Sequence, residues 1–214
     1  MRVVTLASGS SGNCHILIAN NGRKILLDCG IKFKTIITKE EFGWVNEYDF
    51  VYVSHEHIDH SRAMEDFVKA GVKVVSYLAP QLNPVKIGQF VIKMFHLQHN
   101  ADNYGIIIVD TLPGEKFAYA TDFISLPQIL GLDTFLCEVN HDTDIINGRV
   151  NKYGLDGLNM GFKWHFSLQQ MIEWLKKCKE PPKELIICHT SKDNAVKNKI
   201  LKEIRKYIKN ARFA

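Results

Sequence analysis

Short apolar runs bounded by glycine, proline and small polar residues recur along most of the chain, a pattern typical of buried β-strands. The tripeptide Asn20–Asn21–Gly22 between two such runs predicts a hairpin turn. Strands are therefore expected over residues 3–7, 14–19, 23–27, 49–54, 72–77, 89–96, 104–110, 116–121, 134–138 and 184–188.

Three segments instead repeat apolar residues at helical spacing, and helices are predicted over residues 61–70, 167–178 and 194–209. Gly71 stands where the C-terminal cap of the first helix is expected. Consecutive strands open the chain, and strands and helices alternate later, which predicts an α/β fold (α+β in some classifications) with helices outside a mixed sheet. No fixed-period repeat, low-complexity tract or linker divides the sequence, so we expect one domain over residues 1–214.

Composition is that of a globular protein, with 46% hydrophobic and 23% charged residues. The five cysteines are scattered without a CxxC pair, which favours a reducing compartment and argues against a zinc ribbon. No apolar run reaches the roughly 20 residues that span a bilayer, and the N-terminal apolar stretch is too short for a signal peptide. We therefore expect a cytoplasmic protein without a membrane partner. A net charge of +4 permits a polyanionic partner without requiring one.

The strongest chemical signal is a run of potential metal ligands directly after the strand predicted at 49–54, namely His55, His57, Asp59 and His60. In extended backbone the first three point to one side because side chains alternate, and His60 points to the other side unless the chain turns there. Two groups of ligands from one loop can serve two metal ions. Imidazoles and carboxylates suit zinc, with manganese or iron as alternatives.

This His-x-His-x-Asp-His motif resembles the signature of the metallo-β-lactamase fold superfamily. The other landmarks of that superfamily also follow strands, in the expected chain order: Asp28 in ILLDCG, His99 in LQHNA, Asp122 in AYATD and His189 in IICHT. The resemblance spans residues 28–189 and implies a four-layer αββα sandwich.

A narrower resemblance is to the YycJ/WalJ-like branch of this superfamily, whose members are regarded as metal-dependent nucleases or phosphodiesterases. It rests on the SGSSGN loop at 8–13, the segment 138–142 and the segment 164–167. Trp164 stands where glycine is usual in that branch, and Leu168 where asparagine is usual. The chain is also shorter than is usual in the branch, as in phage or mobile-element versions.

The resemblance implies a centre with two divalent metal ions, zinc being expected. One ion would be held by His55, His57 and His99, the second by Asp59, His60 and His189, and both by Asp122, with Asp59 also counted as catalytic. His96 is a rival for the position of His99, but it lies within the predicted strand. Asp28 would orient a ligand imidazole, unless it only forms a local turn, and Asn13 is expected near the ions.

His141 and His165 are both candidates for the proton donor to the leaving group, and the sequence does not choose between them. His165 could instead be a packed residue beside Trp164. The C-terminal segment is rich in basic residues, and the candidate nucleic-acid contacts there are Lys192, Lys197 and Lys199. An ordinary solvated surface is the alternative for these lysines.

The predicted function is a dinuclear metal-dependent phosphodiesterase or nuclease that acts on DNA or RNA through a metal-bridging hydroxide. The alternative is a hydrolase of a small substrate, such as a cyclic nucleotide, thioester, lactone or β-lactam. A metal-stabilised binding module is disfavoured because structural zinc sites are closed and mononuclear. An oxygen reductase is disfavoured because related iron proteins carry a flavodoxin-like domain that 214 residues cannot accommodate. The oligomeric state is left open.

Overall fold

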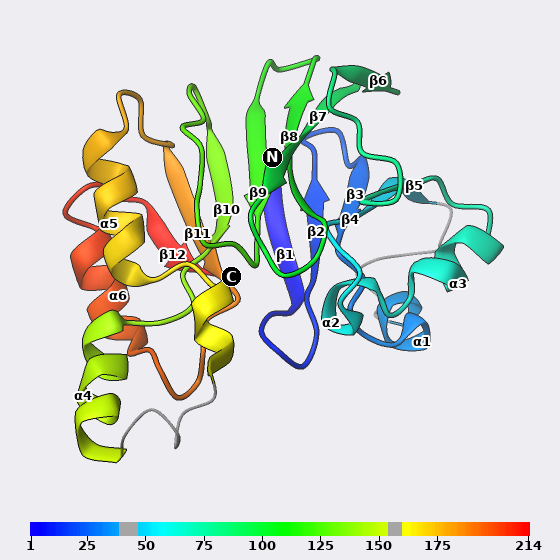
Figure 1. Cartoon of the computed structure of the whole chain (residues 1–214). Coiled ribbons are helices and arrows are strands. Elements are labelled where there is room, and N and C mark those ends of the chain that lie inside the picture. Colours follow the sequence, from blue (N-terminus) through cyan, green and yellow to red (C-terminus); the bar gives the residue numbers. More distant parts are fainter. Residues whose placement is uncertain (39–46, 154–159) are drawn as a thin grey trace.

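Two β-sheets lie face to face in the computed structural model, which describes residues 1–38, 47–153 and 160–214 (Figure 1). The first sheet runs in the order β1 (Arg2–Ala7), β2 (Cys14–Ile18), β3 (Lys24–Leu27), β4 (Tyr48–Val53) and β5 (Val74–Ser76). The second runs in the order β12 (Ala211–Phe213), β11 (Glu184–Cys188), β10 (Thr134–Glu138), β9 (Lys116–Ala120), β8 (Asn103–Asp110), β7 (Phe90–Leu97) and β6 (Val85–Ile87).

Helices cover the outer side of each sheet (Figure 1). Beside the first sheet lie α1 (Phe33–Ile37), α2 (Ile58–Ser61) and α3 (Met64–Lys69). Beside the second lie α4 (Thr143–Tyr153), the 3-10 helix η3 (Met160–Trp164), α5 (Leu168–Lys177) and α6 (Lys197–Ile204). Ser167 caps α5, since its side chain accepts from the amide of Gln170 while the Gln170 side chain accepts from the amide of Ser167.

Three layers of buried side chains hold this arrangement together. Leu17 and Phe50 of the first sheet share one cluster with Ile106 and Leu136 of the second, so this cluster fills the space between the sheets. A second cluster packs Phe67 of α3 on the outer face of the first sheet, and a third packs α5 and α6 on the outer face of the second. The predicted α/β class and four-layer αββα sandwich are therefore confirmed.

Strand direction places the candidate site residues at one edge of each sheet. In the first sheet β3, β4 and β5 are parallel, and in the second sheet β9, β10, β11 and β12 are parallel. The carboxyl ends of parallel strands meet at the same edge, where open α/β sheets bind their ligands. The residues that follow β3, β4, β9, β10 and β11 are those that the sequence singled out.

Most predicted strands agree with the structure within one or two residues, but the helix predicted at 61–70 is two short helices. The break arises because the carbonyl of Asp59 accepts from the amide of Asn13 at 2.7 Å, while the amide of Ala63 donates to the carbonyl of Cys29 at 3.0 Å. Neither group is then available to continue α2. Gly71 follows α3 in the left-handed region, with φ 77°, as a C-terminal cap requires.

The helix predicted at 194–209 is also shorter. It begins at Lys197, because Val196 has extended backbone, and it ends at Ile204, where the chain turns to place β12 beside β11. The sequence analysis did not predict α1, β6, α4, η3 or β12. These are short elements or, in α4, a largely polar helix in which Ile146 is buried, so their apolar periodicity is weak.

Gly30 allows the loops that carry the site residues to touch. Its amide donates to the carbonyl of Asn13 at 2.8 Å, and the neighbouring amide of Cys29 donates to the carbonyl of His60 at 2.8 Å. A Cβ atom on residue 30 would stand 1.6 Å from the carbonyl oxygen of Asp59. Only glycine fits between these backbones.

We therefore expect Gly30→Ala to lower the free energy of unfolding by about 1–3 kcal/mol, because the added methyl group must push backbone apart. Urea denaturation followed by circular dichroism measures this change. Gly148→Ala is the matched control, since nothing lies within 4 Å of that position in α4, and it should stabilise the helix by up to about 1 kcal/mol. Unchanged stability in Gly30→Ala would contradict this account of the loop contact.

Candidate metal centre

Three site residues sit at strand ends in a backbone conformation that side chains rarely adopt. Asp28 after β3, Asp122 after β9 and His189 after β11 have φ values of 55°, 55° and 50°. Among the described residues they are the only non-glycine residues with positive φ. Such conformations cost on the order of 1–3 kcal/mol each and gather at functional sites. The left-handed turn aims each side chain back across the end of its own sheet.

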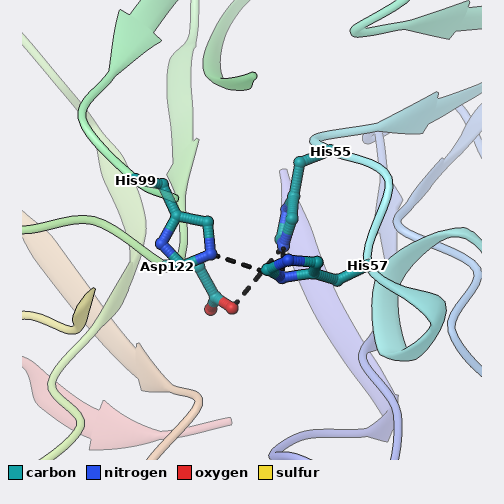
Figure 2. Close-up of side chains that lie close together, drawn as sticks. All are labelled: His55, His57, His99 and Asp122. Carbon is teal, nitrogen blue, oxygen red and sulfur yellow. Dashed lines mark hydrogen bonds and ion pairs between the residues drawn. The ribbon is translucent and has the colours of Figure 1, made fainter. Parts of the chain in front are cut away.

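The first group of potential ligands joins the two sheets, with His55 and His57 following β4 and with His99 and Asp122 coming from the second sheet (Figure 2). His57 Nδ1 lies 3.1 Å from His55 Nε2 and 3.3 Å from His99 Nε2. A neutral imidazole carries only one N–H, so three ring nitrogens around one point cannot satisfy one another. A divalent cation would bind all three lone pairs, and the group fits a metal ion.

The second group lies next to the first and contains Asp59, His60, Asp122 and His189. His60 Nε2 is 3.4 Å from both Asp59 Oδ2 and Asp122 Oδ2. His189 Nε2 is 3.7 Å from Asp59 Oδ2 and is buried without a hydrogen-bond partner. His60 faces this group because α2 begins at Ile58 and turns the chain. Asp122 belongs to both groups, and in each group the ligand atoms lie within 4.8 Å of one another.

Asp28 is a fully buried carboxylate that holds the second group in place. Its Oδ2 lies 2.6 Å from His60 Nδ1 and accepts from the hydroxyl groups of Ser54 and Tyr119 at 3.0 and 2.7 Å. Because Asp28 contacts Nδ1 of His60, the other ring nitrogen, Nε2, faces Asp59 and Asp122. This contact corresponds to the orienting role that the sequence analysis expects of Asp28. Tyr119 was missed there because a tyrosine inside an apolar strand is indistinguishable from core.

Asn13 lies beside the same imidazole, with Nδ2 3.0 Å from His60 Nε2. Its side chain also donates to the carbonyl of Gly9 at 3.1 Å and accepts from the amide of Gly9 at 2.9 Å. The Gly/Ser loop, residues 8–13, is thereby held against the candidate centre.

A third group shares Asp122 and His189 and adds Glu138 and His165. Glu138 is fully buried at the end of β10, and its Oε1 lies 2.7 Å from His165 Nδ1. Its Oε2 accepts from the amide of Asp122 at 2.5 Å. Glu138 therefore fixes His165 at the edge of the two ligand groups.

Protonation states in this cluster suit cation binding. Burial lowers the pKa of His55 to about 2, so its ring is neutral and its lone pair is available. Burial alone would raise the pKa of Asp122, but His189 and His60 outweigh it and hold that pKa well below its usual range. Asp122 is consequently ionised at the point where the groups meet.

Other predicted residues lie outside these groups. His141 is buried against Phe162, with ring centroids 5.6 Å apart, and belongs to none of the ligand groups. His96 is exposed on β7, and the structure brings His99 to the centre instead.

The three candidate nucleic-acid contacts differ in their surroundings. Lys192 lines a cavity beside the centre, whereas Lys197 Nζ lies 4.8 Å from the ring centroid of Phe213. Lys199 forms ion pairs with Asp142 and Asp144, so its charge is already matched.

Comparisons with known proteins agree with this fold. Residues 7–83 match a family model described as Anti-Pycsar protein Apyc1. The matched segment is less than half of the chain. No curated protein matches the sequence. The structure is similar to the metallo-β-lactamase fold protein YhfI from Bacillus subtilis, with 15% identity, a TM-score of 0.73 and coverage of 99% of this chain and 95% of that chain.

Two further solved structures share the arrangement. Human tRNase Z, short form, is 16% identical with a TM-score of 0.66 over 100% of this chain and 96% of its own. Yeast PDE1 is 11% identical with a TM-score of 0.62 over 99% and 96%. The chain therefore has the metallo-β-lactamase fold, as the sequence motifs predict. The narrower resemblance to the YycJ/WalJ-like branch finds no support in these matches and stays a prediction.

The described helices include none that is both long enough and apolar enough to cross a membrane.

Proposed function

We propose that this protein is a metal-dependent phosphodiesterase with a dinuclear centre. The observation that carries the proposal is the pair of adjacent ligand groups that share Asp122. His55, His57 and His99 would hold one ion, Asp59, His60 and His189 the other, and Asp122 both. When bound, such a pair of divalent ions, zinc or alternatively manganese or iron, supplies an acidified water and charge neutralisation at a phosphoryl group.

The proton for the leaving group would come from His165 rather than His141. His165 lies against Glu138 and at 5.0 Å between ring centroids from His189, so its ring borders the place where a bound phosphodiester would react. Glu138 Oε1 lies 2.7 Å from Nδ1 of that ring, so Nε2 would be the nitrogen that delivers the proton. His141 belongs to none of the ligand groups and is packed against Phe162.

Nucleic acid is the substrate class we favour, in line with the tRNase Z likeness and the exposed basic side chain of Lys192, which lines the cavity beside the centre. The alternative is a small substrate such as a cyclic nucleotide. It is supported by a cavity of about 410 Å³ beside the centre, a size that suits small ligands.

We expect protein reconstituted with zinc or manganese to hydrolyse bis(p-nitrophenyl) phosphate and labelled DNA or RNA. Asp59→Ala/His60→Ala should lose about 100-fold or more of this turnover, because it removes two of the ligands proposed for one ion and leaves only His189 and the shared Asp122. His96→Ala, at an exposed position of β7, is the matched control and should keep full activity. Equal activity in the double variant would remove the dinuclear mechanism. Turnover of a thioester or lactone, with none of any phosphodiester, would favour another hydrolase class.

The role of His165 is tested through the leaving group. His165→Gln should lower turnover of a dinucleotide, whose alcohol leaving group needs a proton, by about 100-fold. The same variant should barely affect bis(p-nitrophenyl) phosphate, since p-nitrophenolate leaves without protonation. His141→Gln serves as the comparison and should behave like the unmodified protein on both substrates. A loss of the same size on both substrates in His165→Gln would indicate a structural role instead.

A further inference from the structure

A cavity of about 410 Å³ opens next to the candidate centre and shares His165 and His189 with it. Its other walls come from the Gly/Ser loop at 8–11, from Asn140 after β10, from α4 and η3, and from the loop at 190–194 that follows β11. A phosphodiester placed at the ligand groups would therefore extend one of its two substituents into this space.

The walls of the cavity are fixed to the centre by hydrogen bonds. Ser8 Oγ accepts from the amide of His189 at 2.9 Å, which joins the Gly/Ser loop to the end of β11. Asn140 donates to the carbonyl of His189 at 2.8 Å, and the amide of Ser191 donates to the carbonyl of Asn140 at 2.8 Å. These hydrogen bonds fix the positions of both loops relative to the ligand groups. The cavity is therefore a structured part of the same site.

Two cationic side chains, Arg149 and Lys192, line this space. Arg149 Nη1 donates to Asn194 Oδ1 at 2.7 Å, a neutral partner that orients the guanidinium without cancelling its charge. Asn194 is itself held, since its carbonyl accepts from the amide of Asp142 at 2.8 Å.

Within the described ranges no carboxylate lies at ion-pair distance from Arg149 or from Lys192, in contrast to Lys199 with its two aspartates. Asp193 is the one acidic residue among the lining side chains. The excess of positive charge calls for an anionic ligand.

We propose that this cavity binds a second phosphate of the substrate, one adjacent to the scissile phosphodiester, through Arg149 and Lys192; the inference rests on the phosphodiesterase function proposed above. A guanidinium presents a planar fork that matches phosphate oxygens, and the serine hydroxyls of the Gly/Ser loop add further donors. The preferred substrates are then oligonucleotides or dinucleotides with a terminal phosphate. A diester whose only phosphate is the scissile one leaves the two cations unmatched.

The test compares thymidine dinucleotides with and without a terminal 5′- or 3′-phosphate, using bis(p-nitrophenyl) phosphate as a substrate that has no second phosphate. The unmodified protein should prefer one phosphorylated dinucleotide, and Arg149→Gln should lower kcat/KM for it by about tenfold or more, mainly through KM. Lys192→Gln should have a smaller effect, because its side chain is exposed. Turnover of bis(p-nitrophenyl) phosphate should not change in either variant.

Arg2→Gln on β1 is the matched control and should leave all substrates unaffected. Calorimetric binding of thymidine 3′,5′-bisphosphate, which contains no diester, gives a readout that does not need activity. Binding that is lost in Arg149→Gln and kept in Arg2→Gln supports the cavity even if no phosphodiester is hydrolysed. The proposal is overturned if Arg149→Gln binds the bisphosphate like the unmodified protein, or if it lowers turnover of all substrates equally.

Discussion

The structure depends on one demanding constraint, the convergence of histidine and aspartate side chains from two different sheets on two adjacent, largely buried ligand groups. His55, His57 and His60 follow a strand of the first sheet, whereas Asp122 and His189 follow strands of the second. Their ring nitrogens and carboxylate oxygens face one another rather than ordinary partners. Asp28, Asp122 and His189 also hold left-handed backbone. A fold keeps such a costly arrangement when the surrounding structure over-determines it.

Asp28 is the residue that connects this constraint to the rest of the fold. Its buried carboxylate joins Ser54, which follows β4, and His60 on α2 to the hydroxyl of Tyr119 on β9 of the second sheet. Gly30, two residues later, allows the loops at 13 and 59 to pass at backbone contact. The residues that orient the candidate ligands thus also connect the two sheets. Stability and function of this region are expected to change together.

The proposed activity follows from what surrounds the ligand groups. Glu138 sets His165 at their edge, where a proton can be delivered to a leaving oxygen. The cavity on the far side of His165 and His189 carries Arg149 and Lys192, and it gives the substrate's remaining charge a place to bind. The ligand groups and His165 would then carry out the reaction, and the cavity with Arg149 and Lys192 would select the substrate.

Sequence patterns predicted the fold class and the strands, and the resemblance to the metallo-β-lactamase fold superfamily implied that His99, Asp122 and His189 converge on residues 55–60. They succeeded because histidine and aspartate directly after apolar strands are conspicuous and their chain order is characteristic.

They failed where partners distant in the chain decide the outcome. The division of the helix at 61–70 depends on a hydrogen bond between Asn13 and Asp59 that no local pattern encodes. In the sequence, Tyr119 is indistinguishable from a core residue, and Arg149 is one basic residue among many. Their roles become visible only in the folded structure.

The most direct test is X-ray diffraction from crystals of zinc-reconstituted protein, recorded on both sides of the zinc absorption edge. The account predicts two anomalous peaks per chain. One should lie among His55, His57 and His99 and the other among Asp59, His60 and His189, with Asp122 between them. A single peak, a peak away from these residues or no peak at all would contradict it.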